Sequence, residues 1–316
     1  MADLLDRKLV FVTGKGGTGK TTIAAALAWL AAQRGKKTLV CEVDAKGDLA
    51  DLYETGPTRF EEREVAPRLW AMSMDTEASL KQYLSLQLKL PLVAKVGPLA
   101  KMFDFVASAA PGVREIVTVG KLCWEVRERH YDFIVVDASA SGHIVGQLAA
   151  PQAINQLIQV GLVRQQTGWM LDILGDPATT GLVVVATPAE MPVSETLELT
   201  ERVRSETNVD LAAVVVNRVL PELFGRGEEE VFDRLGESVD SRARLEERLG
   251  GPLTPLLDAA RLTVTMRRSR TEHLERLRNA VDPAIPMLYM PYLFFRAHGL
   301  RATHQIADAL SAELGY

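Results

Sequence analysis

The chain has 316 residues, of which 47% are hydrophobic, and a formal net charge of −5. This length fits one large α/β domain with ample material for a core, while the negative charge argues against nucleic-acid binding, which depends on basic patches. No apolar run approaches the roughly 20 residues of a membrane span, and the acidic start shows no signal peptide. The two cysteines lack C-x-x-C spacing and fit a reducing compartment. We therefore expect a cytoplasmic chain.

The first predicted elements surround a glycine-rich loop. An apolar run over residues 8–13 predicts a buried strand. Residues 14–21 then read Gly-Lys-Gly-Gly-Thr-Gly-Lys-Thr, which fits the phosphate-binding loop pattern G-x-x-x-x-G-K-[ST]. The alanine-rich residues 22–30 predict a helix that Gly35 can end. Backbone N–H groups of such a loop and of the helix N-terminus bind phosphates, and glycine allows their close approach.

This loop predicts the binding of ATP with Mg²⁺. Lys20 would contact the outer phosphates, and the Thr21 hydroxyl would hold the metal ion. A chance glycine-rich turn is the alternative, and the predicted strand before the loop and helix after it argue against that. The residues expected to hold the phosphates are Gly16, Gly17, Thr18, Gly19, Lys20, Thr21 and Thr22.

Six further apolar runs alternate with helical stretches along the chain. Continuous apolar strands of this kind are typical of a parallel sheet that helices cover on both faces. Helical insertions are expected over residues 76–130 and 151–178, and a charged helical segment over 220–280. We therefore predict an α/β three-layer P-loop NTPase fold, with a largely parallel central sheet and an inserted helical subdomain in a single domain over residues 1–316. The six runs are residues 38–43, 69–74, 133–137, 182–186, 213–217 and 287–290.

Two of the predicted strands end in aspartate. In an open α/β sheet the ligand site lies at the carboxyl ends of the strands, where we expect Asp44 and Asp137. A carboxylate at this edge can orient an attacking water or bind Mg²⁺ through water. We assign the first role to Asp44 and the second to Asp137; a helix cap is the alternative for each.

The extra lysine in the loop points to a family. With Lys15, residues 14–22 follow the form G-K-G-G-x-G-K-T-T, which resembles the deviant-Walker ATPases, among them the arsenite-pump ATPase, the eukaryotic ATPase that targets tail-anchored membrane proteins, MinD, ParA and the nitrogenase iron protein. The resemblance implies a dimer in which Lys15 reaches the partner's nucleotide. A cation supplied in trans can accelerate phosphoryl transfer by roughly 10³–10⁵. A solvated loop lysine is the alternative.

Two later segments narrow the resemblance to the arsenite-pump and tail-anchored-targeting branch. Residues 44–51 are similar to its first switch, and residues 137–151 to its second, including the Gly-His pair at 142–143. Residues 189–196 also look like a family segment. The resemblance implies that Asn217 reads adenine and that the loop over Pro291, Tyr292 and Leu293 covers the base. An amide offers a donor and an acceptor together, which suits adenine.

The departures from the family pattern matter as well. The first switch lacks the family's proline and asparagine and carries Lys46 and Gly47, and the second switch lacks the proline before Ser141. We therefore expect slow hydrolysis. The zinc-clasp cysteines of the eukaryotic targeting ATPase are absent, so we expect no zinc-joined dimer. The metalloid-site cysteines are absent too, and arsenite prefers thiolate ligands, which disfavours an arsenite-stimulated pump.

Two helical intervals bear on what the ATPase handles. Leu99, Met102, Phe103 and Val106 recur at helical spacing, and residues 151–175 carry more apolar side chains than one amphipathic face uses. The family places its hydrophobic client groove in the matching regions, and an apolar Met- and Leu-rich surface suits a client helix. Helix-on-helix core or a dimer interface is the alternative.

We therefore expect an Mg²⁺-dependent ATPase, either a homodimer or a heterodimer with a related ATPase, that handles a hydrophobic protein client or a membrane partner. Two other classes stay open. One is a positioning switch like MinD or ParA, although the C-terminal residues 303–314 lack the Lys and Arg of a basic membrane-binding helix. The other is a weakly hydrolysing subunit of a heteromeric ATPase, which the altered switches favour.

Overall fold

The computed structural model describes residues 4–44, 46–88, 112–158, 160–222, 225–294 and 299–316. Within them the strands form one sheet of eight, in the order β3-β4-β2-β5-β1-β6-β7-β8. Neighbouring strands are parallel, except that β3 pairs with β4 in antiparallel fashion. The predicted largely parallel α/β fold is confirmed. The strands are β1 (Leu9–Gly14), β2 (Thr38–Glu42), β3 (Arg63–Ala66), β4 (Leu69–Ser73), β5 (Phe133–Asp137), β6 (Thr180–Ala186), β7 (Leu211–Val219) and β8 (Met287–Pro291).

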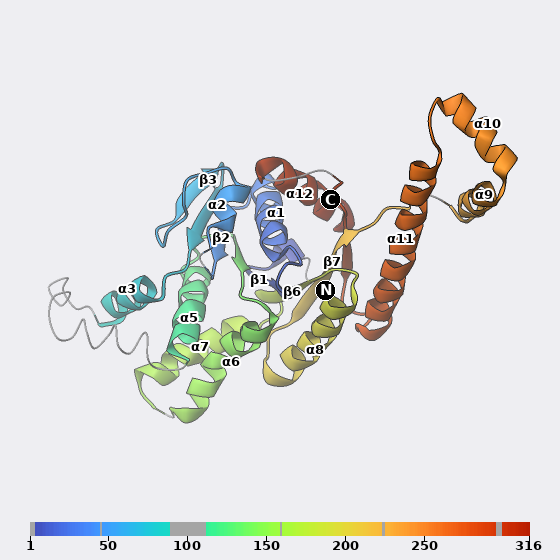
Figure 1. Ribbon diagram of the computed structural model, residues 1–316. Helices are drawn as coiled ribbons and strands as arrows, with labels where there is room; N and C mark the ends of the chain where they lie inside the picture. The colour runs from blue at the N-terminus through green and yellow to red at the C-terminus, as the bar shows by residue number, and fades with distance from the viewer. Residues whose placement is uncertain (1–3, 45, 89–111, 159, 223–224, 295–298) are drawn as a thin grey trace.

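Helices cover both faces of this sheet. Two long helices, α1 and α12, lie on one face, and α5 to α8 lie on the other (Figure 1). A short 3-10 turn, η1 (Leu4–Asp6), precedes the first strand. The helices are α1 (Lys20–Gln33), α2 (Asp48–Leu52), α3 (Thr76–Leu88), α5 (Val113–Arg127), α6 (Ser141–Leu157), α7 (Leu162–Gly175), α8 (Glu190–Glu206), α9 (Arg226–Glu237), α10 (Val239–Leu249), α11 (Thr254–Ala280) and α12 (Gly299–Glu313).

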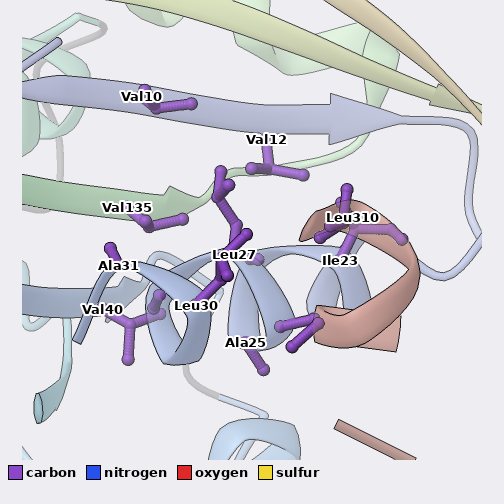
Figure 2. Packing of buried hydrophobic residues seen from close by; sticks show 14 of the residues in the cluster. Val10, Val12, Ile23, Ala25, Leu27, Leu30, Ala31, Val40, Val135 and Leu310 are labelled. Atoms are coloured by element: carbon purple, nitrogen blue, oxygen red, sulfur yellow. The ribbon is translucent and has the colours of Figure 1, made fainter. Parts of the chain in front are cut away.

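The central strand β1 explains why its sequence reads as one apolar run. Successive side chains point to opposite faces of a strand, so Val10 and Val12 join the cluster around α1 while Leu9 and Phe11 join the cluster under α5 to α8. Figure 2 shows Val10 and Val12 above Leu27 of α1. Each fully buried Val or Leu contributes about 1.5–3 kcal/mol. Helix α1 is therefore held firmly behind the glycine-rich loop.

Helices α9, α10 and α11 lie between β7 and β8 in the chain and form an arm that projects to one side of the sheet (Figure 1). The base of the arm is anchored, because Leu277 and Val281 pack with Val193 of α8. Further out, α10 buries none of its residues. Across the described residues, every helix is too short or too polar to traverse a bilayer.

Candidate nucleotide-binding site

The glycine-rich loop connects β1 to α1, and two of its glycines are required by their surroundings. Gly14 has φ 147°, and a Cβ there would lie 2.1 Å from the carbonyl oxygen of Val185 on β6. Gly19 has φ 94°, and a Cβ there would lie 2.4 Å from Nδ2 of Asn217. Any larger residue would push the loop away from its neighbouring strands, so the turn into α1 depends on both glycines.

Lys20 and Thr18 close the loop on itself. The Lys20 ammonium donates to the carbonyl oxygen of Lys15 at 3.4 Å, and the Thr18 hydroxyl donates to the same oxygen at 2.9 Å. Burial lowers the pKa of Lys20, and the nearby carboxylate of Asp137 opposes that effect. The lysine is thus preplaced over the loop, where an anion can displace its contact with a neutral carbonyl.

Asp137 is a buried carboxylate with an oxygen that can contact a cation. It is 7% exposed, its side chain is hydrogen-bonded with Thr21, and its Oδ1 has no hydrogen-bond partner. Burial raises its pKa to about 7, against the opposing effects of the Thr21 hydrogen bond and the Lys20 charge. A hydroxyl beside an unpartnered carboxylate oxygen is an oxygen donor set that Mg²⁺ prefers. The residues present therefore fit an Mg²⁺ ion, held by Thr21 and supported by Asp137.

Asp44 lies on the other side of the cleft, beyond the end of β2. The strand ends at Glu42, one residue before the end of the predicted run over residues 38–43. The Asp44 side chain is 39% exposed, and its Oδ2 lies 4.0 Å from the Lys46 ammonium. A half-exposed carboxylate here can reach solvent and ligand alike, which is compatible with orienting water. That role stays a prediction.

Glu42 lines the cleft, and the sequence analysis did not single it out. It is 2% exposed, and its carboxylate accepts hydrogen bonds from the backbone N–H groups of Lys46, Gly47 and Asp48 at 3.1–3.2 Å. The Ser73 hydroxyl donates to it as well. Glu42 thereby anchors the backbone of the first switch. A charged residue at the end of an otherwise apolar strand is the signal that could have revealed it.

Lys15 does not line the cleft in this structure. Its ammonium forms an ion pair with Glu195 on α8, and the two side chains are 28% and 32% exposed. The Ser141 hydroxyl, at the start of α6, lies 3.5 Å from the other Glu195 oxygen. The loop lysine is therefore tied within its own chain to the second switch and α8, and it stays partly open to a partner.

Asn217 lies under the loop. Its Nδ2 donates to the carbonyl oxygen of Thr18 at 2.8 Å, and its Oδ1 accepts from the N–H of Arg218 at 2.9 Å. Asn217 is 6% exposed, so in this structure its amide serves the loop and its own strand, and its predicted contact with adenine stays a prediction. The predicted covering loop leaves β8 beside it, since the N–H of Tyr292 donates to the carbonyl oxygen of Val219 at 2.8 Å.

Part of the predicted site lines a cleft of about 610 Å³ at the carboxyl edge of the sheet. Lys15, Thr18, Asn217, Pro291, Tyr292 and Leu293 lie outside its lining, and the contribution of the last three to base binding stays a prediction. One residue that was not predicted, Arg218, lines the cleft from β7. The predicted site residues that the cleft brings together are Gly16, Gly17, Gly19, Lys20, Thr21, Thr22, Asp44 and Asp137.

The structure describes only part of the predicted client-binding region, and part of what it describes is core. Leu99, Met102, Phe103 and Val106 lie outside the described residues. In α7, Met170 and Leu174 are core residues, as the alternative interpretation of residues 151–175 had it. At the junction of α6 and α7, however, Leu157 and Val160 are each 81% exposed. Only this junction offers a free apolar surface in the described part of the interval.

The fold and the phosphate loop are those of a P-loop NTPase, and comparison with known proteins gives the family. A profile of the anion-transporting ATPase (ArsA) family matches residues 7–170 and 160–230. The chain belongs to the anion-transporting ATPase family.

Three relatives show the range of that family. The chain is 33% identical over 225 residues to ATPase BagA of Mycobacterium tuberculosis, a match that covers 68% of this chain and 66% of that protein, just under two thirds. It is 25% identical over 314 residues to ATPase GET3 of Chaetomium globosum, covering 95% and 89% of the two chains. It is 24% identical over 259 residues to an ATPase ASNA1 homolog of Entamoeba dispar, covering 68% and 77%.

Proposed function

We propose that this ATPase hydrolyses Mg²⁺-ATP. The observation that carries the proposal is the pairing of Thr21 with the buried, half-partnered carboxylate of Asp137, directly beside Lys20 at the start of α1. Backbone N–H groups of the loop and the helix N-terminus would bind the phosphates. When bound, Mg²⁺ would neutralise charge that builds up on the transferred phosphate.

Four residues around the cleft would each have a part in that reaction. Lys20 would exchange its contact with the Lys15 carbonyl oxygen for the outer phosphates. Asp44, on the β2 side, would orient the attacking water, and Glu42 would hold the switch backbone that positions it. Asn217 supports the loop from below through Thr18. Positioning of this kind supplies most of the catalysis in phosphoryl transfer.

We further propose that the active form is a dimer, of two copies or with a related ATPase. Lys15 supports this, because its ammonium is held by Glu195 near the surface rather than over its own phosphate loop. A partly exposed ion pair is worth only about 0–1 kcal/mol, so a partner's nucleotide could readily displace Glu195. The two cysteines are free and buried. Free thiols fit a reducing compartment, and we therefore propose that the chain is cytoplasmic.

The output that we propose is the handling of a hydrophobic protein segment. Leu157, at the end of α6, and Val160, just before α7, support it, because both are large apolar side chains that are exposed. Helix α6 begins within the segment that resembles the second switch. Replacing Leu157 and Val160 with serine should abolish ATP-dependent capture of a synthetic apolar helical peptide. The matched control is Leu256→Ser on the arm, which is 57% exposed. Equal capture by all three proteins would contradict this surface.

Calorimetry tests the nucleotide site itself. Lys20→Ala removes the cation that contacts the outer phosphates, so its affinity for Mg²⁺-ATP should fall at least about tenfold. Lys36→Ala serves as control, because Lys36 follows the C-terminal end of α1, away from the loop, and pairs with Asp6. Unchanged affinity of the Lys20→Ala protein would overturn the proposed function.

A further inference from the structure

We propose that Arg218 covers the face of the nucleotide base and that Asn217 is its positioning residue. This inference rests on the proposed nucleotide site and assigns it a further binding residue. Arg218 lines the cleft from β7, and neither the sequence pattern nor the chemistry of the phosphate site calls for an arginine there.

The order of the strands decides which part of a nucleotide would meet Arg218. In the sheet, β1 has β5 and then β2 on one side, and β6 and then β7 on the other. The groups suited to Mg²⁺ and to the attacking water, Asp137 and Asp44, follow β5 and β2. The outer phosphates therefore lie toward that side. The sugar and base must extend the other way, toward β6 and β7, where Arg218 lies.

The backbone at Arg218 departs from a regular strand. Its φ is 60°, a left-handed conformation that residues with a Cβ seldom adopt. The pairing of β7 with β8 shifts register between Val216 and Val219, so residues 217 and 218 form an irregularity of the bulge type. Bulges re-aim side chains and are frequent beside active sites. Residues 212–217 of β7 are buried without a break, whereas Arg218, at the shift, is exposed.

Three hydrogen bonds hold this conformation. The N–H of Arg218 donates to Oδ1 of Asn217 at 2.9 Å, and Nδ2 of Asn217 donates to Thr18 of the phosphate loop at 2.8 Å. The carbonyl oxygen of Arg218 accepts from the Arg270 guanidinium at 3.4 Å. The strained residue is thus fixed relative to the loop that binds phosphates, as a ligand contact needs to be.

The guanidinium itself has no hydrogen bond or ion pair with any described residue. A planar, weakly hydrated cation is well suited to stack on the π-face of a base. Adenine and guanine both present such a face, so stacking by Arg218 would favour a base without choosing between purines.

Arg218→Gly is the decisive variant, because glycine adopts φ 60° freely and removes only the side chain. Calorimetry should show its affinity for Mg²⁺-ATP reduced roughly 5- to 100-fold. Its affinity for Mg²⁺-tripolyphosphate, which has no base, should change less than about twofold. Mg²⁺-GTP should lose affinity by the same factor as Mg²⁺-ATP. Arg218→Lys, which keeps the charge without the plane, should recover only part of the loss.

The matched control is Arg129→Gly. Arg129 has φ 56°, is exposed, and follows α5 at the opposite edge of the sheet, so its replacement should leave all affinities unchanged. An equal loss for tripolyphosphate would make Arg218 a phosphate contact, and no loss for ATP would make it a surface residue; either result overturns the proposal. A wild-type chain that bound neither ligand would instead overturn the nucleotide site as a whole, and Arg218 with it.

Discussion

Asp137 should make the ligand-free protein less stable as the pH rises. Its pKa is raised from 3.8 to about 7, mainly by burial and further by Glu42 and Asp48, against the lowering effects of Thr21 and Lys20. The folded chain then holds a proton that the unfolded chain releases between these two values. Stability from this group is fully present below 3.8 and is lost as the pH rises to about 7.

The size of the effect follows from the shift. At about 1.4 kcal/mol per pKa unit, the loss above pH 7 amounts to about 4 kcal/mol of unfolding free energy. Asp137→Asn keeps the shape of the side chain and removes the charge. We therefore expect the variant to be more stable than wild type by about 4 kcal/mol at pH 8, and by about 0.5 kcal/mol at pH 4.

Urea unfolding followed by circular dichroism measures this difference, with a chelator present and no nucleotide, so that no cation offsets the buried charge. The quantity to compare is the gap between the two proteins at each pH, because groups that do not interact with Asp137 titrate equally in both and cancel. A gap that stays constant from pH 4 to pH 8 would refute the reasoning. It would mean that the Asp137 carboxylate is well solvated or already paired.

Two predictions concern turnover. Asp44→Asn should keep ATP affinity and lose hydrolysis by on the order of 10² or more in single-turnover kinetics; if turnover survives, Asp44 only follows the strand and orients no water. Lys15→Ala and Asp44→Asn chains, each inactive alone, should regain part of their activity when mixed, because one site of the hybrid dimer combines an intact Asp44 with a Lys15 from the other chain. Light scattering must first show that the hybrid forms, and a proven hybrid without turnover would leave Lys15 as a contact within its own chain.

The sequence alone determined the parts of this protein that depend on neighbours along the chain. The phosphate loop is one example, because strand, glycines, Lys20 and helix follow one another directly. The buried parallel strands are another, because a strand covered on both faces must be apolar throughout. By contrast β3 was not predicted, since Arg63 and Glu64 are exposed and leave no apolar pattern. An edge strand of this kind is specified by its pairing with β4.

Only the tertiary structure decided which distant residues meet. Lys15 and Glu195 are 180 residues apart, and Asn217 and Thr18 are 199 apart, so no local pattern links them. Arg218 would read as an ordinary exposed residue at a strand end, and its place in the cleft follows from the bulge between β7 and β8. Local patterns record what each residue buries, whereas the order of strands in the sheet decides which side chains share one edge.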